Sequence, residues 1–291
     1  MSVLSTLFDQ FLRERRYLKN VTPKTVMWYQ TAFDALTRTV PVVDAADLSK
    51  PLLQEFVVRL RERGLAPVSC NTYVKGVNSF VAWLHAEGHI PALLVLHPQR
   101  IEKRLVQTLT DEHLKRLVAY KPKSADQWRA YALACTLTDT GIRIEEALGL
   151  RQGDVDHDNL LLKVRGKGRK ERLVPFSFEL RRVLFRWQQM TQRTRWASDW
   201  LFPTRAATKL TQRNALRAHY ALLKRIHIPK SGFHRLRHTF ATSYLQNGGD
   251  VVRLSRVLGH AQVTTTMRYL HLVTTDLQKP HQQLSILNRL R

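Results

Sequence analysis

Apolar side chains recur at helical spacing through most of the first hundred residues. Positions three or four apart share one face of a helix, and the first such series comprises Leu4, Leu7, Phe8, Phe11 and Leu12. A second helix is predicted to begin at Thr22 and Pro23, because threonine caps helices and proline suits their first turn. Two more apolar series predict helices over residues 46–60 and 69–84. The N-terminal part is therefore predicted to be all-helical.

A polar, basic and proline-containing segment follows these helices at residues 98–107. Segments of this composition commonly join domains. We therefore divide the chain into a helical domain at 1–97, a linker at 98–107 and a second domain at 108–291. From the residues alone, the helical domain suits a protein-interaction module and a DNA clamp equally well.

The second part combines helices with one predicted β-hairpin. A capped helix starts after Thr110, and further helices are expected over residues 130–138, 179–194 and 212–226. Strand-like segments at 159–164 and 171–175 flank a basic, glycine-rich turn that carries Lys167 between two glycines. Such a turn suits a phosphate-binding tip and a solvated loop equally well.

Three short helices are predicted towards the C-terminus. The first begins near His234 and ends at the turn 247–249. Asp250 is a suitable N-cap for a second helix, which Gly259 closes. Tyr269 falls on a third. Two helices joined by a short turn are also typical of helix–turn–helix DNA-binding regulators, which is one alternative for this stretch.

Charge narrows the choice of partners. Residues 1–105 hold 14 Lys and Arg against 9 Asp and Glu, and residues 106–291 hold 33 against 14. Most of the net charge of +24 therefore lies in the second part. A surplus of this size indicates a polyanionic partner. Because the basic residues are dispersed rather than gathered on one amphipathic helix, nucleic acid is favoured over an acidic membrane surface.

Other features of the sequence indicate a cytoplasmic protein without membrane contact. Cys70 and Cys135 lack CxxC spacing, so free thiols in a reducing compartment are expected. The longest apolar run, 90–96, is far shorter than the roughly 20 residues of a membrane helix. The first residues also lack the basic-then-apolar order of a signal peptide.

Metal and nucleotide chemistry are not indicated. His234 and His238 are spaced as in the HExxH zinc motif, but Arg235 replaces the glutamate and no acidic or cysteine ligand is near. The P-loop, the dinucleotide-binding glycine pattern and the GxSxG elbow are missing from the sequence. We expect neither a metal nor a cofactor.

Cleavage of a phosphodiester by a protein nucleophile is the remaining hypothesis. It requires cations around the phosphate oxygens, an acid for the leaving oxygen and a nucleophile. Suitable side chains occur at Arg143, Lys167, Arg237, His260 and Tyr269. Each of them alone has an ordinary structural explanation. Glu146, three residues after Arg143, could hold its guanidinium group or form an ordinary surface ion pair with it.

Order and spacing set these residues in a familiar pattern. The motifs are, in order, TGIRIEEALGL, VRGKGRKERLVP, HRLRHTFAT, LGH and a tyrosine nine residues after that histidine. Together they resemble the tyrosine recombinase (integrase) family, and most of all its Xer-type bacterial members, over nearly the whole chain. The resemblance implies a mainly α fold with a small β-sheet. In that fold a helical SAM-like core-binding domain precedes an α+β catalytic domain.

The resemblance also implies how DNA would be cut. Arg143 and Arg237 would clamp the scissile phosphate, and Tyr269 would attack it to form a 3′-phosphotyrosyl bond. Lys167 would protonate the departing 5′-oxygen. Because the phosphotyrosyl bond preserves the energy of the broken bond, neither ATP nor a metal would be needed.

Further residues have supporting roles in this interpretation. His260 would donate a hydrogen bond to the phosphate, His234 would assist proton transfer with the tyrosine, and Glu146 would support Arg143. Candidate DNA-binding residues are Lys24, Arg165, Arg169 and Lys170. The partner implied is double-stranded DNA at core sites, with strand exchange through a Holliday junction.

The same resemblance implies a tetramer on DNA, in which the C-terminal tail contacts a neighbouring protomer. Pro280 leaves the start and register of a tail helix open. A type IB topoisomerase uses similar chemistry and is a second alternative to recombination. The sequence does not distinguish integration or excision of mobile elements from plasmid, transposon or chromosome-dimer resolution.

Overall fold

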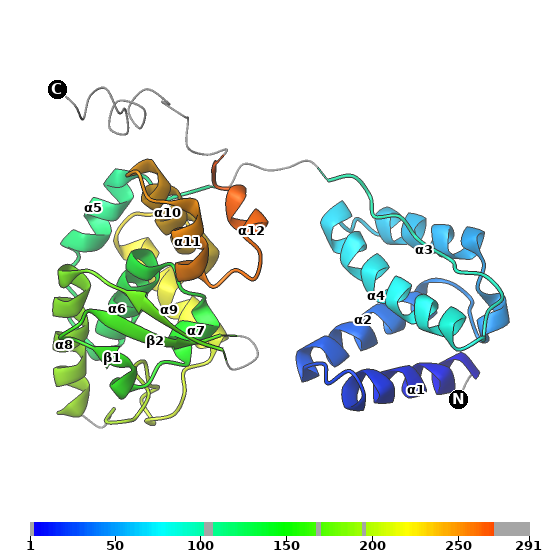
Figure 1. The fold of residues 1–291 in the computed structure, drawn as a ribbon, viewed down its shortest axis with the longest axis horizontal. Coiled ribbons are helices and arrows are strands. Elements are labelled where there is room, and N and C mark those ends of the chain that lie inside the picture. Colours follow the sequence, from blue (N-terminus) through cyan, green and yellow to red (C-terminus); the bar gives the residue numbers. More distant parts are fainter. Residues whose placement is uncertain (1–2, 102–106, 167–169, 194–195, 271–291) are drawn as a thin grey trace, which may run out of the picture. The chain divides into compact units, whose positions relative to one another are not determined.

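The computed structural model describes residues 3–101, 107–166, 170–193 and 196–270. The chain divides into two compact units, Met1–Arg104 (unit 1) and Leu105–Arg291 (unit 2) (Figure 1), and each has its own hydrophobic core. Within the described ranges, no helix is long and apolar enough to cross a membrane. The DNA-clamp role of the first domain and the linker at 98–107 stay predictions.

Unit 1 is all-helical, as predicted. Its elements are α1 (Val3–Tyr17), α2 (Pro23–Thr39), η1 (Ala45–Asp47), α3 (Lys50–Glu62) and α4 (Pro67–Ala86). The predicted cap of α2 is confirmed, because Thr22 Oγ1 accepts a hydrogen bond from the Thr25 N–H. Aromatic rings fill the core: Phe8 stacks on Phe33 with centroids 3.9 Å apart, and Phe80 meets Phe8 edge-on at 5.1 Å.

The third predicted helix begins later than expected, at Lys50. The residues before it form η1, a 3₁₀ turn closed by a capping box between Asp44 and Asp47. Ser49 then caps α3. The apolar pattern runs across this break because Leu48, in the connection, is buried like a helical residue. Capping side chains rather than periodicity set the boundary here.

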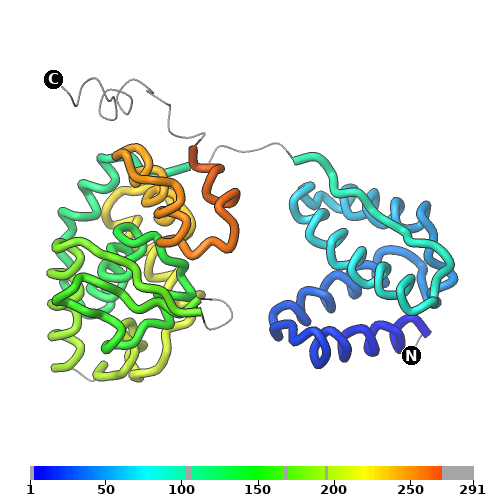
Figure 2. Tube along the Cα trace, viewed as in Figure 1, coloured from blue at the N-terminus to red at the C-terminus, as the bar shows by residue number. Residues whose placement is uncertain are grey.

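Unit 2 is built around α6 (Ala125–Thr140), which is buried on most of its surface. The helices packed against it are α8 (Phe178–Gln192), α9 (Gln212–Arg225) and α10 (Phe233–Gln246). The remaining helical elements are α5 (Asp111–Ala119), α7 (Ile144–Leu148), η2 (Gln152–Asp154), α11 (Val251–Leu258) and α12 (Thr264–Met267). The segment from α10 to α12, orange to red in Figure 2, covers one end of the unit.

A three-stranded antiparallel sheet in the order β1-β2-β3 completes unit 2. Its strands are β1 (Val155–Asp156), β2 (Leu161–Arg165) and β3 (Glu171–Pro175). The predicted hairpin corresponds to β2 and β3, in which Leu162 pairs with Val174 and Val164 pairs with Arg172. The pattern did not predict β1, because two residues are too few to show alternation.

The register of β2 and β3 places Arg172 on the inward face of the sheet. It shares this face with the fully buried Leu162, Val164 and Val174.

Gly141 allows α6 and α10 to approach closely. It ends α6 in the left-handed conformation, with φ of 64°, which glycine adopts without strain. A Cβ atom at this position would lie 2.2 Å from Cδ1 of Phe240 on α10. The turn predicted here therefore requires glycine at position 141 for two reasons: the left-handed backbone conformation and the lack of space for a Cβ atom.

We expect Gly141→Ala to lower the free energy of unfolding by about 3 kcal/mol or more, because backbone strain and overpacking add. Gly248→Ala is the matched control in the same unit. Its φ of 83° is also left-handed, but nothing lies within 4 Å of the added Cβ, so only the strain of about 1 kcal/mol should appear. Urea unfolding of both variants measures the difference, and equal losses would contradict the steric account.

Candidate active site

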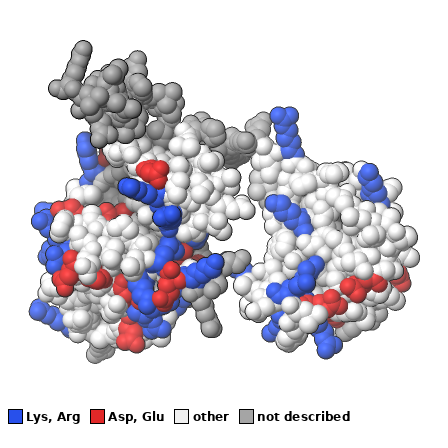
Figure 3. Space-filling view, viewed as in Figure 1, with Lys and Arg blue, Asp and Glu red and all other residues white. Residues whose placement is uncertain are grey.

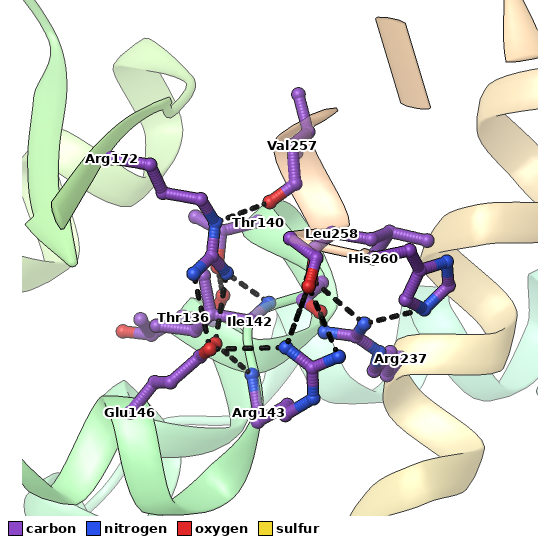
Figure 4. A network of polar contacts seen from close by, with 12 residues as sticks. Thr136, Thr140, Ile142, Arg143, Glu146, Arg172, Arg237, Val257, Leu258 and His260 are labelled. Carbon is purple, nitrogen blue, oxygen red and sulfur yellow. Dashed lines mark hydrogen bonds and ion pairs between the residues drawn. The ribbon is translucent and has the colours of Figure 1, made fainter. Parts of the chain in front are cut away.

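Arg143 stands between α6 and α7, where it is the N-cap residue of α7. Its backbone N–H donates to Glu146 Oε2 at 2.8 Å, and its Nη1 donates to Glu146 Oε1 at 3.1 Å. The hydrogen bond expected between these two side chains is therefore present. The guanidinium also donates to the carbonyl oxygens of Leu258 and Gly259, each at 3.2 Å (Figure 4). These contacts fix it at the end of α11, yet its side chain stays 41% exposed.

Glu146 binds a second arginine, Arg172 of β3. Arg172 donates from Nη1 to Oε1 at 3.0 Å and from Nη2 to Oε2 at 2.8 Å, in a bidentate pair. Its Nε donates to the Val257 carbonyl oxygen at 2.9 Å. A Cβ atom at Gly259 would lie 2.8 Å from Arg172 Cζ. Because Gly259, which ends α11, has no side chain, the Arg172 guanidinium can pack against the backbone at that residue.

The two arginines hold the Glu146 carboxylate in its charged form. Burial by itself would raise the pKa of this carboxyl group. Hydrogen bonds from Arg172 and from the Arg143 backbone N–H outweigh burial, and the pKa is lowered from its ordinary value. One buried anion therefore anchors two cations.

Arg237, on the first turns of α10, is almost fully buried at 5% exposure. Its Nη1 donates to the Gly141 carbonyl oxygen at 2.7 Å, and its Nη2 donates to that of Leu258 at 2.9 Å. Burial, and next the charge of Arg143, lower the pKa of Arg237 to about 10. The guanidinium nevertheless stays charged at neutral pH.

His260 follows the left-handed Gly259 and faces Arg237. Its Nε2 lies 2.9 Å from Arg237 Nη2, and its Nδ1 lies 2.6 Å from Thr266 Oγ1. Burial, with the charges of Arg237 and Arg143, lowers the pKa of His260 to about 4. The ring is therefore neutral at pH 7, so Nε2 accepts from Arg237 and the N–H on Nδ1 donates to Thr266.

Tyr269 was predicted to lie on a helix, but it lies just beyond the end of α12. Its N–H donates to the Thr266 carbonyl oxygen at 2.9 Å. The side chain is 0% exposed. Its ring belongs to a small core between α10 and α11 that comprises Ala241, Leu245, Leu254 and Leu258. Within the described residues, the histidine that contacts the Tyr269 hydroxyl is His238, whose Nδ1 is 2.8 Å away. His234, one turn earlier on α10, is exposed.

A cleft of about 820 Å³ opens beside these groups. Arg143 and His260 line it, together with Arg165, Lys170 and Arg172 from the hairpin. Arg165 forms a bidentate pair with the buried carboxylate of Asp154, at 2.8 and 2.9 Å. The carboxylate partly neutralises the charge that Arg165 can offer to a ligand. Figure 3 shows acidic side chains interspersed among basic ones on the face of unit 2 that it draws.

Three guanidinium groups therefore meet at the C-terminal end of α11, at the edge of this cleft, and two of them, those of Arg143 and Arg172, also bind the buried Glu146 carboxylate. Their charges exceed that of Glu146, so the site suits an anion rather than a cation. Among the residues that the structure covers, no three His, Cys, Asp or Glu side chains are grouped as metal ligands. Lys167 and Arg169, which were predicted to lie in the basic turn, lie outside the described residues. Lys24 is exposed on the first turn of α2, in unit 1.

Sequence reasoning missed two members of this site. The sequence does not identify Arg172, because its place on the inward face of β3 depends on the register of the strands. His238 was considered only as half of a metal pair. No pattern of spacing in the sequence identifies His238, because its partner Tyr269 is 31 residues away and reaches it only through the turns of the chain after α10.

Comparison with known proteins places this geometry in a family. The Phage integrase family matches residues 107–275, more than half of the chain. Tyrosine recombinase XerC of Xanthomonas campestris pv. campestris (strain B100) is 32% identical over 245 residues, which are 81% of this chain and 74% of the relative. XerC of Oceanobacillus iheyensis is 27% identical over 296 residues, covering 97% of this chain and 96% of the relative. The chain therefore belongs to the phage integrase family of tyrosine recombinases.

Solved structures share the fold at lower identity. XerH recombinase bound to a palindromic difH substrate, in a post-cleavage complex, has a TM-score of 0.75 at 20% identity, covering 98% of this chain and 84% of that one. A lambda integrase tetramer bound to a Holliday junction has a TM-score of 0.75 at 17% identity, covering 92% and 77%. The predicted fold class, mainly α with a small β-sheet, is confirmed.

Replacing Glu146 tests whether it anchors the arginines. We expect Glu146→Gln to lower the free energy of unfolding at pH 7 by about 2 kcal/mol, less than for a fully buried pair because Arg143 is partly exposed. Because the folded-state pKa is lowered, the carboxylate stabilises the protein above the ordinary glutamate pKa of about 4.3. That stabilisation is lost as the pH falls through the folded-state value, so wild type should lose its advantage over the variant in this range.

Glu145→Gln is the matched control, since this neighbouring side chain is exposed. Urea unfolding of both variants at a series of pH values is the measurement. A Glu146→Gln variant as stable as Glu145→Gln at pH 7 would show that the carboxylate does not anchor the site.

Proposed function

We propose that this protein is a site-specific DNA recombinase that cuts and rejoins strands through a covalent bond between Tyr269 and a 3′-phosphate. The observation that carries the proposal is the convergence of Arg143, Arg172 and Arg237 on the carbonyl oxygens at the C-terminal end of α11, beside an open cleft. Membership of the tyrosine recombinase family supports the same chemistry.

The arginines supply the electrostatic part of the reaction. Arg143, with its exposed face, would bind the non-bridging oxygens of the scissile phosphate, and Arg237 would act from the buried side. Both are oriented before DNA arrives by fixed carbonyl oxygens, so little reorganisation is needed as negative charge builds on the phosphate. Their positions are the part of the mechanism that the described contacts support best.

Tyr269 would supply the nucleophile, and its oxygen would attack phosphorus in line with the departing 5′-oxygen. Lys167 is the proposed acid for that oxygen, an assignment that rests on the resemblance of the motif VRGKGRKERLVP to that of tyrosine recombinases. The 3′-phosphotyrosyl bond would then be attacked by the 5′-hydroxyl of a second strand. No ATP or metal takes part, because each step exchanges one phosphodiester for another.

His260 and His234 keep their proposed roles as a donor to the phosphate and as a helper in proton transfer. Both ring nitrogens of His260 have protein partners in the absence of DNA. A bound phosphate would have to replace Thr266 or Arg237 as one of those partners. Its negative charge would also offset the neighbouring cations that keep the ring neutral.

Assembly and biological context are proposed on analogy. A lambda integrase tetramer is seen on a Holliday junction, and we propose that this chain also exchanges strands as a tetramer on double-stranded DNA, with its C-terminal tail on a neighbouring protomer. The tail lies outside the described residues. We place the protein in the cytoplasm, where its free cysteines are kept reduced. Integration, excision and resolution of mobile elements all suit this chemistry, and a two-site recombination assay separates them from simple DNA relaxation.

Replacing the nucleophile is the first test. We expect Tyr269→Phe to keep DNA binding and to form no covalent adduct on a suicide DNA substrate, because only the attacking oxygen is removed. Gel-shift binding and denaturing gels of the trapped complex measure the two properties. Adduct that persists in the variant would overturn the assignment of the nucleophile.

Leaving-group chemistry tests Lys167. We expect Lys167→Ala to slow cleavage of ordinary DNA by about 10²-fold or more. The defect should be much smaller on DNA whose 5′-bridging oxygen is replaced by sulfur, because a thiolate departs without a proton. Single-turnover cleavage rates on the two substrates give the comparison. Equal defects on both would rule out the acid role.

A further inference from the structure

The hydroxyl group of Tyr269 has two polar neighbours of complementary kinds. His238 Nδ1 lies 2.8 Å from it, and Arg268 Nη2 donates to the same oxygen at 3.4 Å. The Arg268 guanidinium also lies over the tyrosine ring, 5.2 Å from its centroid. The phenol therefore faces one group able to take its proton and one cation able to stabilise the oxygen that remains.

His238 is in the state that can accept a proton. Burial, followed by the charges of Arg268, His234 and Arg237, lowers the pKa of His238 to about 4. These groups face it from α10 itself and from the segment after α12. The imidazole is thus neutral at pH 7, and in the tautomer that carries its proton on Nε2 the Nδ1 lone pair accepts a hydrogen bond from the Tyr269 hydroxyl.

We propose that His238 is a catalytic residue that takes the proton of Tyr269 during attack on the phosphate. This inference rests on the proposed function, which makes Tyr269 the nucleophile. As the O–H bond breaks, the proton passes to His238 Nδ1 and a lone pair on the tyrosine oxygen forms the bond to phosphorus. The bond from phosphorus to the 5′-oxygen breaks with its electron pair, and that oxygen is protonated by the acid assigned above. Rejoining reverses each transfer, and the tyrosine recovers its proton from His238.

Substrate binding would strengthen this base when it is needed. In the free protein His238 is a weak base because it is buried and because cations surround it. The phosphate brings negative charge among the same cations, which favours the protonated imidazole and raises its basicity. Proton transfer to His238 is then coupled to the arrival of DNA.

The other two histidines are less suited to take the proton directly, so we reassign that transfer from His234 to His238. His260 already uses both ring nitrogens, on Arg237 and Thr266. His234 is exposed, and its ring centroid lies 6.3 Å from that of His238. Within the part of the chain that the structure describes, His238 is therefore the imidazole in contact with the reacting oxygen.

Two substitutions at position 238 give the primary test. His238→Asn keeps an acceptor atom near the position of Nδ1 but takes up no proton, and His238→Ala removes the contact. We expect both variants to bind DNA and melt like wild type, and to slow covalent capture on the suicide substrate by about 10²-fold or more. A His238→Asn variant that reacts as fast as wild type, or faster, would overturn the proposal.

A tyrosine analogue separates proton acceptance from positioning. With 3,5-difluorotyrosine at position 269 the phenol is more acidic and needs the base less, so the defect of His238→Asn should shrink at least tenfold. The same defect with both phenols would show that His238 only positions the ring, which contradicts the proposal. Wild-type protein that forms no adduct would instead refute the proposed function itself, so the two failures are distinguishable.

Discussion

The C-terminal end of α11 brings three arginines to one place. The consecutive carbonyl oxygens of residues 257–259 accept hydrogen bonds from Arg172, Arg143 and Arg237, and Leu258 accepts from two of them. The end of a helix carries partial negative charge, which favours cations. Together with the Glu146 carboxylate, it offsets the repulsion among three guanidinium groups and leaves a net positive site.

The contacts of the three arginines with α11 hold separate parts of unit 2 together. Arg143 comes from the turn after α6, Arg172 from the inward face of β3, and Arg237 from α10. Each has to reach α11, so the hairpin, the central helix and the C-terminal helices are fixed relative to one another by polar contacts as well as by the core. Gly141 and Gly259 allow the close approaches on which this depends. The helix–turn–helix appearance of α10 and α11 is then explained by scaffolding, since their shared face packs around Tyr269.

Much of this could be predicted from the sequence, and for physical reasons. Helix starts with a capping side chain, such as Thr22 and Asp250, are local and were placed correctly. The break before α3 was missed because the buried Leu48 continues the apolar pattern across it.

At the site, the sequence brought Arg143, Glu146 and Arg237 into consideration by spacing within motifs. It did not find the contacts of Arg172 and His238, because these depend on the register of β3 and on the path of the chain after α11.

The central claim is that Tyr269 forms the covalent bond to DNA. Mass spectrometry of the trapped covalent complex tests this claim most directly. After digestion with nuclease and trypsin, we predict a nucleotide joined through its 3′-phosphate to Tyr269, in the peptide that follows Arg268. A nucleotide on any other side chain, or joined through its 5′-phosphate, would contradict the account.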